Sequence, residues 1–128
     1  MTVQAKIQPF LMFEGKAEEA MTFYVSLYPG SEITELVRYG SGSIMRAAFT
    51  VGGQSILCTD STVHHAFTFT PAISLFVSCD SEAEIRRLAA ALSEGGSEFM
   101  PLDDYGFSRL FAWVSDRFGV SWQLNLVE

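Results

Sequence analysis

An internal repeat is the feature that most constrains the fold of this 128-residue chain. When the sequence is shifted by 66 residues, positions 9–60 and 75–126 carry identical residues at 11 of 52 places, where ordinary composition gives roughly 3 or 4 by chance. The matches gather at turns, as in Gly30-Ser31-Glu32 and Gly96-Ser97-Glu98, where a repeated backbone needs the same residues. Two copies are too few for a solenoid, so we expect one module of about 60 residues that has been duplicated.

Both copies predict the same order of elements, a strand followed by a helix and three more strands. Helical spacing of apolar residues is followed by Pro29-Gly30 in the first copy and by Gly95-Gly96 in the second. The second helix also opens on Ser81-Glu82-Ala83-Glu84, a capping-box spacing. We therefore predict a single domain over residues 1–128, with a first βαβββ module at 5–60, a linker at 61–71 and a second module at 72–128. The predicted strands are 7–13, 32–39, 44–51, 54–59, 72–79, 98–103, 108–115 and 120–127, with helices at 16–28 and 81–94.

Composition excludes several classes of partner. The net charge is −7, so the chain has no basic stripe for nucleic acid and its field disfavours anionic membranes. No apolar run approaches the roughly 20 residues that span a bilayer. Cys58 and Cys79 are too few for a disulfide framework and lie in apolar runs, which is typical of buried reduced thiols. Residues 1–10 show no export signal, so we expect a cytoplasmic protein without nucleic-acid or membrane partners.

Several motifs give the repeat a family likeness. They span Phe10–Tyr24, Tyr28–Gly30, Gly52–Gln54, Pro71–Val77 and Trp113–Gln123. Together they resemble the PhnB-like branch of the vicinal oxygen chelate superfamily, which includes glyoxalase I, bleomycin-resistance proteins and extradiol dioxygenases. The resemblance implies an α+β fold in which two βαβββ modules form curved antiparallel or mixed sheets with helices outside. It also implies that each sheet cups a cavity and that two chains pair as a homodimer.

The resemblance also bears on cofactors. Metal-using members bring four ligands into the cup, usually His, Glu or Gln, and the motifs place these positions at Pro9, Leu57, Ile73 and Gln123. Three of these side chains have no donor atom, and one glutamine cannot hold a divalent ion. The adjacent histidines at 64–65 lie in the linker and should point to opposite sides. We therefore expect no metal and no other cofactor.

Relatives in this branch often carry a methyltransferase name connected with ubiquinone synthesis. The sequence has no glycine-rich strand-to-helix loop for a nucleotide-like cofactor, and it is too short for a doubly wound sheet with a substrate domain. We do not expect methyl transfer, and no catalytic residue is assigned.

Strand alternation identifies the residues that should face the cavities. In the last strand the apolar series 120, 122, 124 and 126 should pack under a helix, which turns the polar series toward the cavity. In strand 44–51 we expect Met45, Ala47, Phe49 and Val51 on the helix side, and Ile44, Arg46, Ala48 and Thr50 on the cavity side. We also place Trp113 and Trp122 under the helices. The predicted ligand pocket consists of Arg46, Ser55, Leu57, Thr59, Ser121, Gln123 and Asn125.

Two of these residues have specific alternatives. Arg46, where PhnB-like relatives often have histidine, is predicted either to bind a carboxylate or phosphonate or to pair with an acid such as Glu35. Gln123 either orients a ligand amide or hydroxyl or solvates an open sheet face. Asp116 is predicted to cap amides in the turn that it opens.

Three functional hypotheses follow. The first is a metal-free protein that binds a small organic molecule in an aromatic-walled cleft. The second is a metal-dependent lyase, isomerase or dioxygenase of the same superfamily. The third is a structural dimer that no longer binds a ligand. Whether the chain catalyses a reaction is left open at this point.

Overall fold

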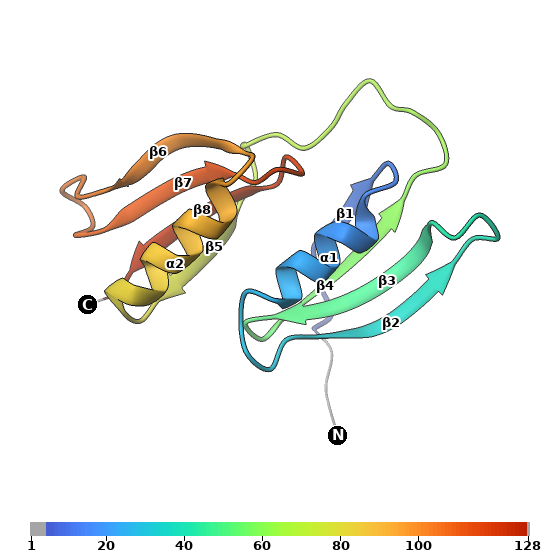
Figure 1. Cartoon of the computed structure of the whole chain (residues 1–128), viewed down its shortest axis with the longest axis horizontal. Coiled ribbons are helices and arrows are strands. Elements are labelled where there is room, and N and C mark those ends of the chain that lie inside the picture. Colours follow the sequence, from blue (N-terminus) through green and yellow to red (C-terminus); the bar gives the residue numbers. More distant parts are fainter. Residues whose placement is uncertain (1–4, 128) are drawn as a thin grey trace. The chain divides into compact units, whose positions relative to one another are not determined.

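The computed structural model describes residues 5–127, which divide into two compact units. Unit 1 ends at His65 and unit 2 begins at Ala66. Each unit has the order strand, helix and three strands (Figure 1). Unit 1 contains β1 (Phe10–Phe13), α1 (Ala17–Val25), β2 (Glu32–Arg38), β3 (Ile44–Val51) and β4 (Gln54–Asp60). Unit 2 contains β5 (Leu75–Cys79), α2 (Glu82–Ser93), β6 (Ser97–Asp103), β7 (Phe111–Ser115) and β8 (Ser121–Leu126).

The sheet of unit 1 has the strand order β1-β4-β3-β2. The edge strand β1 runs parallel to β4, and the other neighbours are antiparallel. Helix α1 covers one face of this sheet (Figure 1) and buries Met21 and Tyr24 fully. Tyr24 stacks on Phe49 of β3, with ring centroids 6.1 Å apart. The β3–β4 hairpin closes through Gly52 and Gly53, both at positive φ, as a two-residue hairpin turn of this kind requires.

Unit 2 repeats this topology with the strand order β5-β8-β7-β6 and one parallel pair, β5 with β8. Helix α2 buries Ile85, Leu88 and Leu92, and the fully buried Val114 and Leu124 come from β7 and β8. Gly96 follows α2, and a Cβ there would lie 2.0 Å from the Ser115 carbonyl oxygen. Only glycine therefore allows the chain leaving α2 to approach β7 this closely.

The two helices begin in different ways. Helix α1 has no side-chain cap from its N-cap residue, Lys16. Instead Asp60, at the end of β4 and 3% exposed, accepts from the amides of Gly15 (2.8 Å), Ala17 (3.0 Å) and Ile44 (3.0 Å). Helix α2 begins with a local capping box in which Ser81 Oγ accepts from the Glu84 amide and the Glu84 carboxylate accepts from the Asp80 amide.

The structure confirms the predicted α+β fold, with every predicted helix and strand present in the predicted order. The placement of Ile44 and Met45 was wrong: Ile44 is fully buried, whereas Met45 is 42% exposed. The reason is a bulge, because β2 pairs Val37 with Arg46 and then Arg38 with Ile44, which leaves Met45 as an extra residue. Neither helix within residues 5–127 is long and apolar enough to cross a membrane.

Candidate functional site

Each sheet has one face against its own helix and one that points away from it. We call the second face the distal face. Strand register decides which residues share it, because directly paired residues point to the same side. In unit 1, Arg46, Ala48 and Thr50 of β3 share the distal face with Ser55, Leu57 and Thr59 of β4. Phe10 and Met12 of β1 join them, opposite Leu57 and Thr59.

Arg46 is engaged by an acid of the neighbouring strand. Its Nε lies 2.8 Å from Glu35 Oε1, and the two side chains are 56% and 47% exposed. Of the two alternatives that the sequence left open, the structure shows the pairing with Glu35. The distal face of unit 1 therefore presents a neutralised pair at this place instead of an isolated cation for an anionic ligand.

The other predicted polar residues of unit 1 also contact neighbours. Ser55 Oγ donates to Gln8 Oε1 at 2.8 Å. Thr59 Oγ1 donates to the main-chain carbonyl of Met45 at 2.7 Å, next to the bulge. Leu57 lies between Ala48 on one side and Phe10 on the other, and Phe10 is 63% exposed. The distal face of unit 1 thus carries both polar and apolar side chains, and Arg46, Ser55 and Thr59 each bond a neighbour within the unit.

The distal face of unit 2 is built differently. Gln123 of β8 is directly opposite Phe76 of β5 and Trp113 of β7, so a glutamine stands between two aromatic residues. Phe76 is 60% exposed. Asn125, two residues along β8, is opposite Ser78 and Phe111. These contacts place the predicted residues Ser121, Gln123 and Asn125 on one sheet face with an aromatic surround.

A network of hydrogen bonds links three side chains of this face with that of Ser74. The Trp113 indole Nε1 donates to Ser121 Oγ at 2.9 Å. Ser121 Oγ lies 2.7 Å from Ser74 Oγ, and Gln123 Nε2 donates to Ser74 Oγ at 3.3 Å. Ser74 precedes β5, so the network ties the edge strand to the two central strands. It fixes the Trp113 ring on the distal face.

Trp113 and its aromatic neighbours were missed as site residues. The sequence interpretation put Trp113 under a helix, but its pairing with Gln123 places it on the distal face. The loop from β7 to β8 is longer than its counterpart in unit 1. Ser115 pairs with Ser121, whereas Thr50 pairs with Ser55 in unit 1, so unit 2 has one more residue in its hairpin. A repeat aligned by a constant shift of 66 therefore reverses the faces of β7. The placement of Trp122, which is 3% exposed and pairs with Val114, is confirmed.

Further rings extend along the β6–β7 hairpin. Phe99 lies 5.1 Å from Trp113 between ring centroids. Phe107 contacts both Phe111, at 5.0 Å, and Tyr105, at 6.2 Å. Alternating aromatic residues in 111–113 are a sequence signal that could have identified this surface, once the longer hairpin loop had been counted.

The described residues do not fit the metal site of the superfamily. Within residues 5–127 no group of three or more His, Cys, Asp or Glu side chains could hold a metal ion. The two linker histidines diverge: His64 Nδ1 lies 2.8 Å from Glu14 Oε1, whereas His65 Nε2 lies 2.8 Å from Ser61 Oγ. The hydrogen bond from His64 also lowers the pKa of the exposed Glu14 carboxyl.

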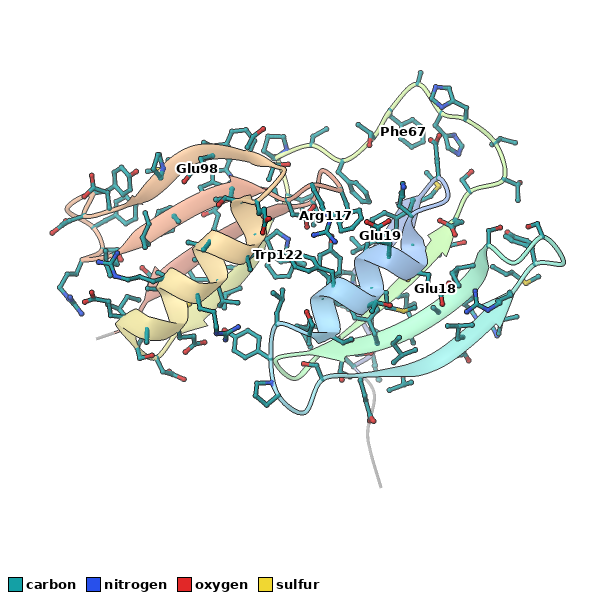
Figure 2. The ribbon with its side chains drawn as sticks, in the orientation of Figure 1. Glu18, Glu19, Phe67, Glu98, Arg117 and Trp122 are labelled. Carbon is teal, nitrogen blue, oxygen red and sulfur yellow. The ribbon has the colours of Figure 1, made fainter. Side chains whose placement is uncertain are left out.

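The buried polar groups serve the fold. Burial raises the pKa of the Cys58 thiol to about 12, so the thiol is protonated near neutral pH and is a poor nucleophile. Asp116 accepts from the amides of Phe118 and Val120 and from the Trp122 indole, at 2.9, 3.1 and 2.9 Å. The predicted capping role of Asp116 is therefore confirmed. On the surface, Arg38 of β2 donates two hydrogen bonds to Glu18. Figure 2 labels Glu18 on α1.

These two βαβββ units define a glyoxalase-like fold of the vicinal oxygen chelate type. A glyoxalase/bleomycin resistance protein/dioxygenase domain from Frankia, 14% identical, shares this fold with a TM-score of 0.69 over 99% of this chain and 94% of its own.

Residues 5–125 match the family described as 3-demethylubiquinone-9 3-methyltransferase, and the chain belongs to that PhnB-like family. The PhnB protein from Bacillus cereus is 50% identical, with a TM-score of 0.94 over 96% of this chain and all of its own. Protein PA1353 from Pseudomonas aeruginosa is 31% identical, with a TM-score of 0.83 over 98% of each chain. No curated protein matches the sequence.

Proposed function

We propose that this PhnB-like protein is a metal-free binding protein for a small organic molecule. The observation that carries the proposal is the distal face of unit 2, where Trp113 and Phe76 flank Gln123. Ligand sites are typically apolar and aromatic surfaces with a few fixed polar groups. The hydrogen bond from the Trp113 indole N–H to Ser121 Oγ holds the ring in place.

The donor chemistry supports binding without a metal. Of the four positions that correspond to superfamily ligands, Pro9, Leu57 and Ile73 carry no side-chain donor atom. Gln123, the fourth, already donates to Ser74. A divalent site needs three or more protein ligands of nitrogen, oxygen or sulfur.

The family's description names a methyl transfer, and we propose binding in its place. In the described residues the strands form two four-stranded sheets, each with only one parallel pair. Neither sheet has the successive parallel strands at whose carboxyl ends a nucleotide-like cofactor is bound in doubly wound folds.

A paired experiment tests the proposal. Protein purified without chelator is analysed for metals before and after loading with nickel, zinc, iron and manganese, and is then screened against small acids, amides and aromatic compounds by thermal shift. We expect no stoichiometric metal and at least one class of stabilising compound. Tight stoichiometric metal would instead support the lyase, isomerase or dioxygenase alternative, and the absence of any stabilising compound would support the structural dimer. S-adenosylmethionine is included in the screen as the test of methyl transfer.

Pairing of chains is a separate proposal. We propose that the protein is a homodimer, as its resemblance to cup-completing members of the superfamily implies. Light scattering across a dilution series measures this directly, and a mass of one chain at every concentration would contradict it.

A further inference from the structure

The hydrogen bonds on the distal face of unit 2 determine which polar groups are left for a ligand. Ser121 is only 2% exposed, and its hydroxyl oxygen already accepts the Trp113 indole N–H. Its own hydrogen must be donated inside the protein, since a buried unpaired donor is costly. Ser74 Oγ, 2.7 Å away, is the neighbouring acceptor. The Ser121 hydroxyl therefore donates to Ser74.

Because Ser121 donates to Ser74, the groups that remain unbonded lie at the Ser74 and Gln123 end of this set of hydrogen bonds. Ser74 Oγ then accepts from Ser121 and from Gln123 Nε2, and its own hydroxyl hydrogen is left to donate outward. Among the described residues, no donor bonds Gln123 Oε1, whose amide group is oriented by its bond to Ser74. The network thus ends in one donor, the Ser74 hydroxyl, beside one acceptor, the Gln123 carbonyl.

Among the described residues of unit 2, the strand register places aromatic side chains and no lysine or arginine around this pair. Phe76 and Trp113 lie opposite Gln123 on the two neighbouring strands, and Met100 continues the same row on β6. The charged residue that the register places on this face is Asp103, opposite Phe111. An acid on the face and a net charge of −7 for the chain disfavour an anion.

We infer that the distal face of unit 2 binds a neutral, flat ring that presents an N–H donor next to a carbonyl acceptor, as in a cyclic lactam or an aromatic amide. The ligand N–H donates to Gln123 Oε1, and the ligand carbonyl accepts from the Ser74 hydroxyl. The ring contacts Trp113 or Phe76. This inference rests on the proposed binding function and names its ligand class.

The test compares three probes of one shape: 2-quinolone, N-methyl-2-quinolone and quinoline-2-carboxylate. Binding to the full chain is measured by the change in tryptophan fluorescence and by two-dimensional NMR. We expect 2-quinolone to bind at least ten-fold more tightly than its N-methyl form, because methylation removes the donor for Gln123. We expect the carboxylate to bind more weakly than 2-quinolone. Equal affinity for the methylated and unmethylated lactams, or preference for the carboxylate, would overturn the inference.

Two variants locate the effect. In Gln123→Leu the difference between 2-quinolone and its N-methyl form should disappear, whereas Gln54→Leu, a glutamine of unit 1, should keep it. A difference that persists in Gln123→Leu would overturn the inference, even if that variant binds both probes. The thermal-shift screen separates two kinds of failure. If only the ligand class is wrong, other compounds of the screen still stabilise the protein. If the proposed binding function is wrong, no compound does.

Discussion

The two units share a topology but hold their helices in different ways. In unit 1 the amides around the start of α1 depend on Asp60, which is 45 residues from Gly15 and 43 from Ala17 in sequence. In unit 2 the start of α2 is satisfied by Ser81 and Glu84 within its own first turn. A repeat therefore preserves the path of the backbone without preserving the side chains that stabilise it. The start of α1 depends on a tertiary contact, and the start of α2 on a local one.

The distal faces differ in a similar way on a shared framework. Gln8 and Ser74 are equivalent under the 66-residue shift, and each bonds the serine that is equivalent in its own unit, Ser55 or Ser121. Two residues along the same central strand, Leu57 of unit 1 is opposite Ala48, whereas Gln123 of unit 2 is opposite Trp113. The same contact is therefore followed by small and aliphatic side chains in unit 1 and by a glutamine with an indole in unit 2.

Removal of Asp60 should have the largest effect on stability. Asp60→Ala leaves three amide donors at a buried position without their acceptor, and we expect a loss of about 4 kcal/mol in the free energy of unfolding. This is a large part of the roughly 5–15 kcal/mol that holds a domain of this size. Urea unfolding followed by circular dichroism measures it.

The matched control is Asp60→Asn. It keeps one oxygen for Gly15 and Ala17 but turns an NH₂ group toward the Ile44 amide, so we expect an intermediate loss. A cost below about 1 kcal/mol for Asp60→Ala would show that α1 does not depend on this distant cap.

The second largest loss of stability should come from alkaline pH, through ionisation of Cys58. Its pKa is raised from 9.0 to about 12 in the folded protein, so the folded state retains the thiol proton after the unfolded chain has lost it. The protonated Cys58 thiol makes its full contribution to the free energy of unfolding below pH 9. This contribution is lost as pH rises from 9 toward 12, by up to about 1.4 kcal/mol per pH unit. Wild type should lose stability over this range relative to Cys58→Ala, measured by urea unfolding at each pH. Parallel curves for the two proteins would contradict this assignment.

The local cap of unit 2 should matter less than the distant cap of unit 1. In Ser81→Ala the Glu84 amide loses its acceptor at an exposed helix end where water can replace it, and we expect a loss of about 1 kcal/mol. Ser81→Asp should restore the cap. The comparison of units would be reversed if Ser81→Ala cost as much as Asp60→Ala in the same urea experiment.

Loss of Arg46 should have the smallest effect. The pair with Glu35 is about half exposed on both sides, and such pairs contribute little. We expect Arg46→Ala to leave the urea midpoint and the affinity for 2-quinolone unchanged within error. A clear loss of binding in Arg46→Ala would move the ligand site to unit 1.

Most of the fold was predictable because its signals are local. Helical spacing, glycine turns and the repeat located every element, and the 44–51 strand was placed at its observed bounds. The bulge at Met45 was not predictable from alternation, because it is set by the pairing of β3 with β2 and by the Ile44–Asp60 hydrogen bond. Asp60 itself gave no signal, since its partners lie far away in sequence.

The candidate site was predictable in part. Alternation in β8 placed Gln123 and Asn125 correctly on the face away from the helix, because that strand is regular. The sequence interpretation misplaced Trp113 of β7, whose faces are reversed relative to β3 by one added residue in the β7–β8 loop. For Arg46 the sequence left two alternatives, and the structure shows one of them, the pairing with Glu35, which depends on the register between two strands.

The central claim is that the distal face of unit 2 binds the ligand, and an NMR titration of ¹⁵N-labelled protein with 2-quinolone tests it most directly. We expect the largest shifts at the Trp113 indole N–H and the Gln123 side-chain amide, with the Arg46 Nε–H unchanged. Shifts confined to Arg46 and its neighbours in unit 1, or no shifts at saturating probe, would contradict the claim.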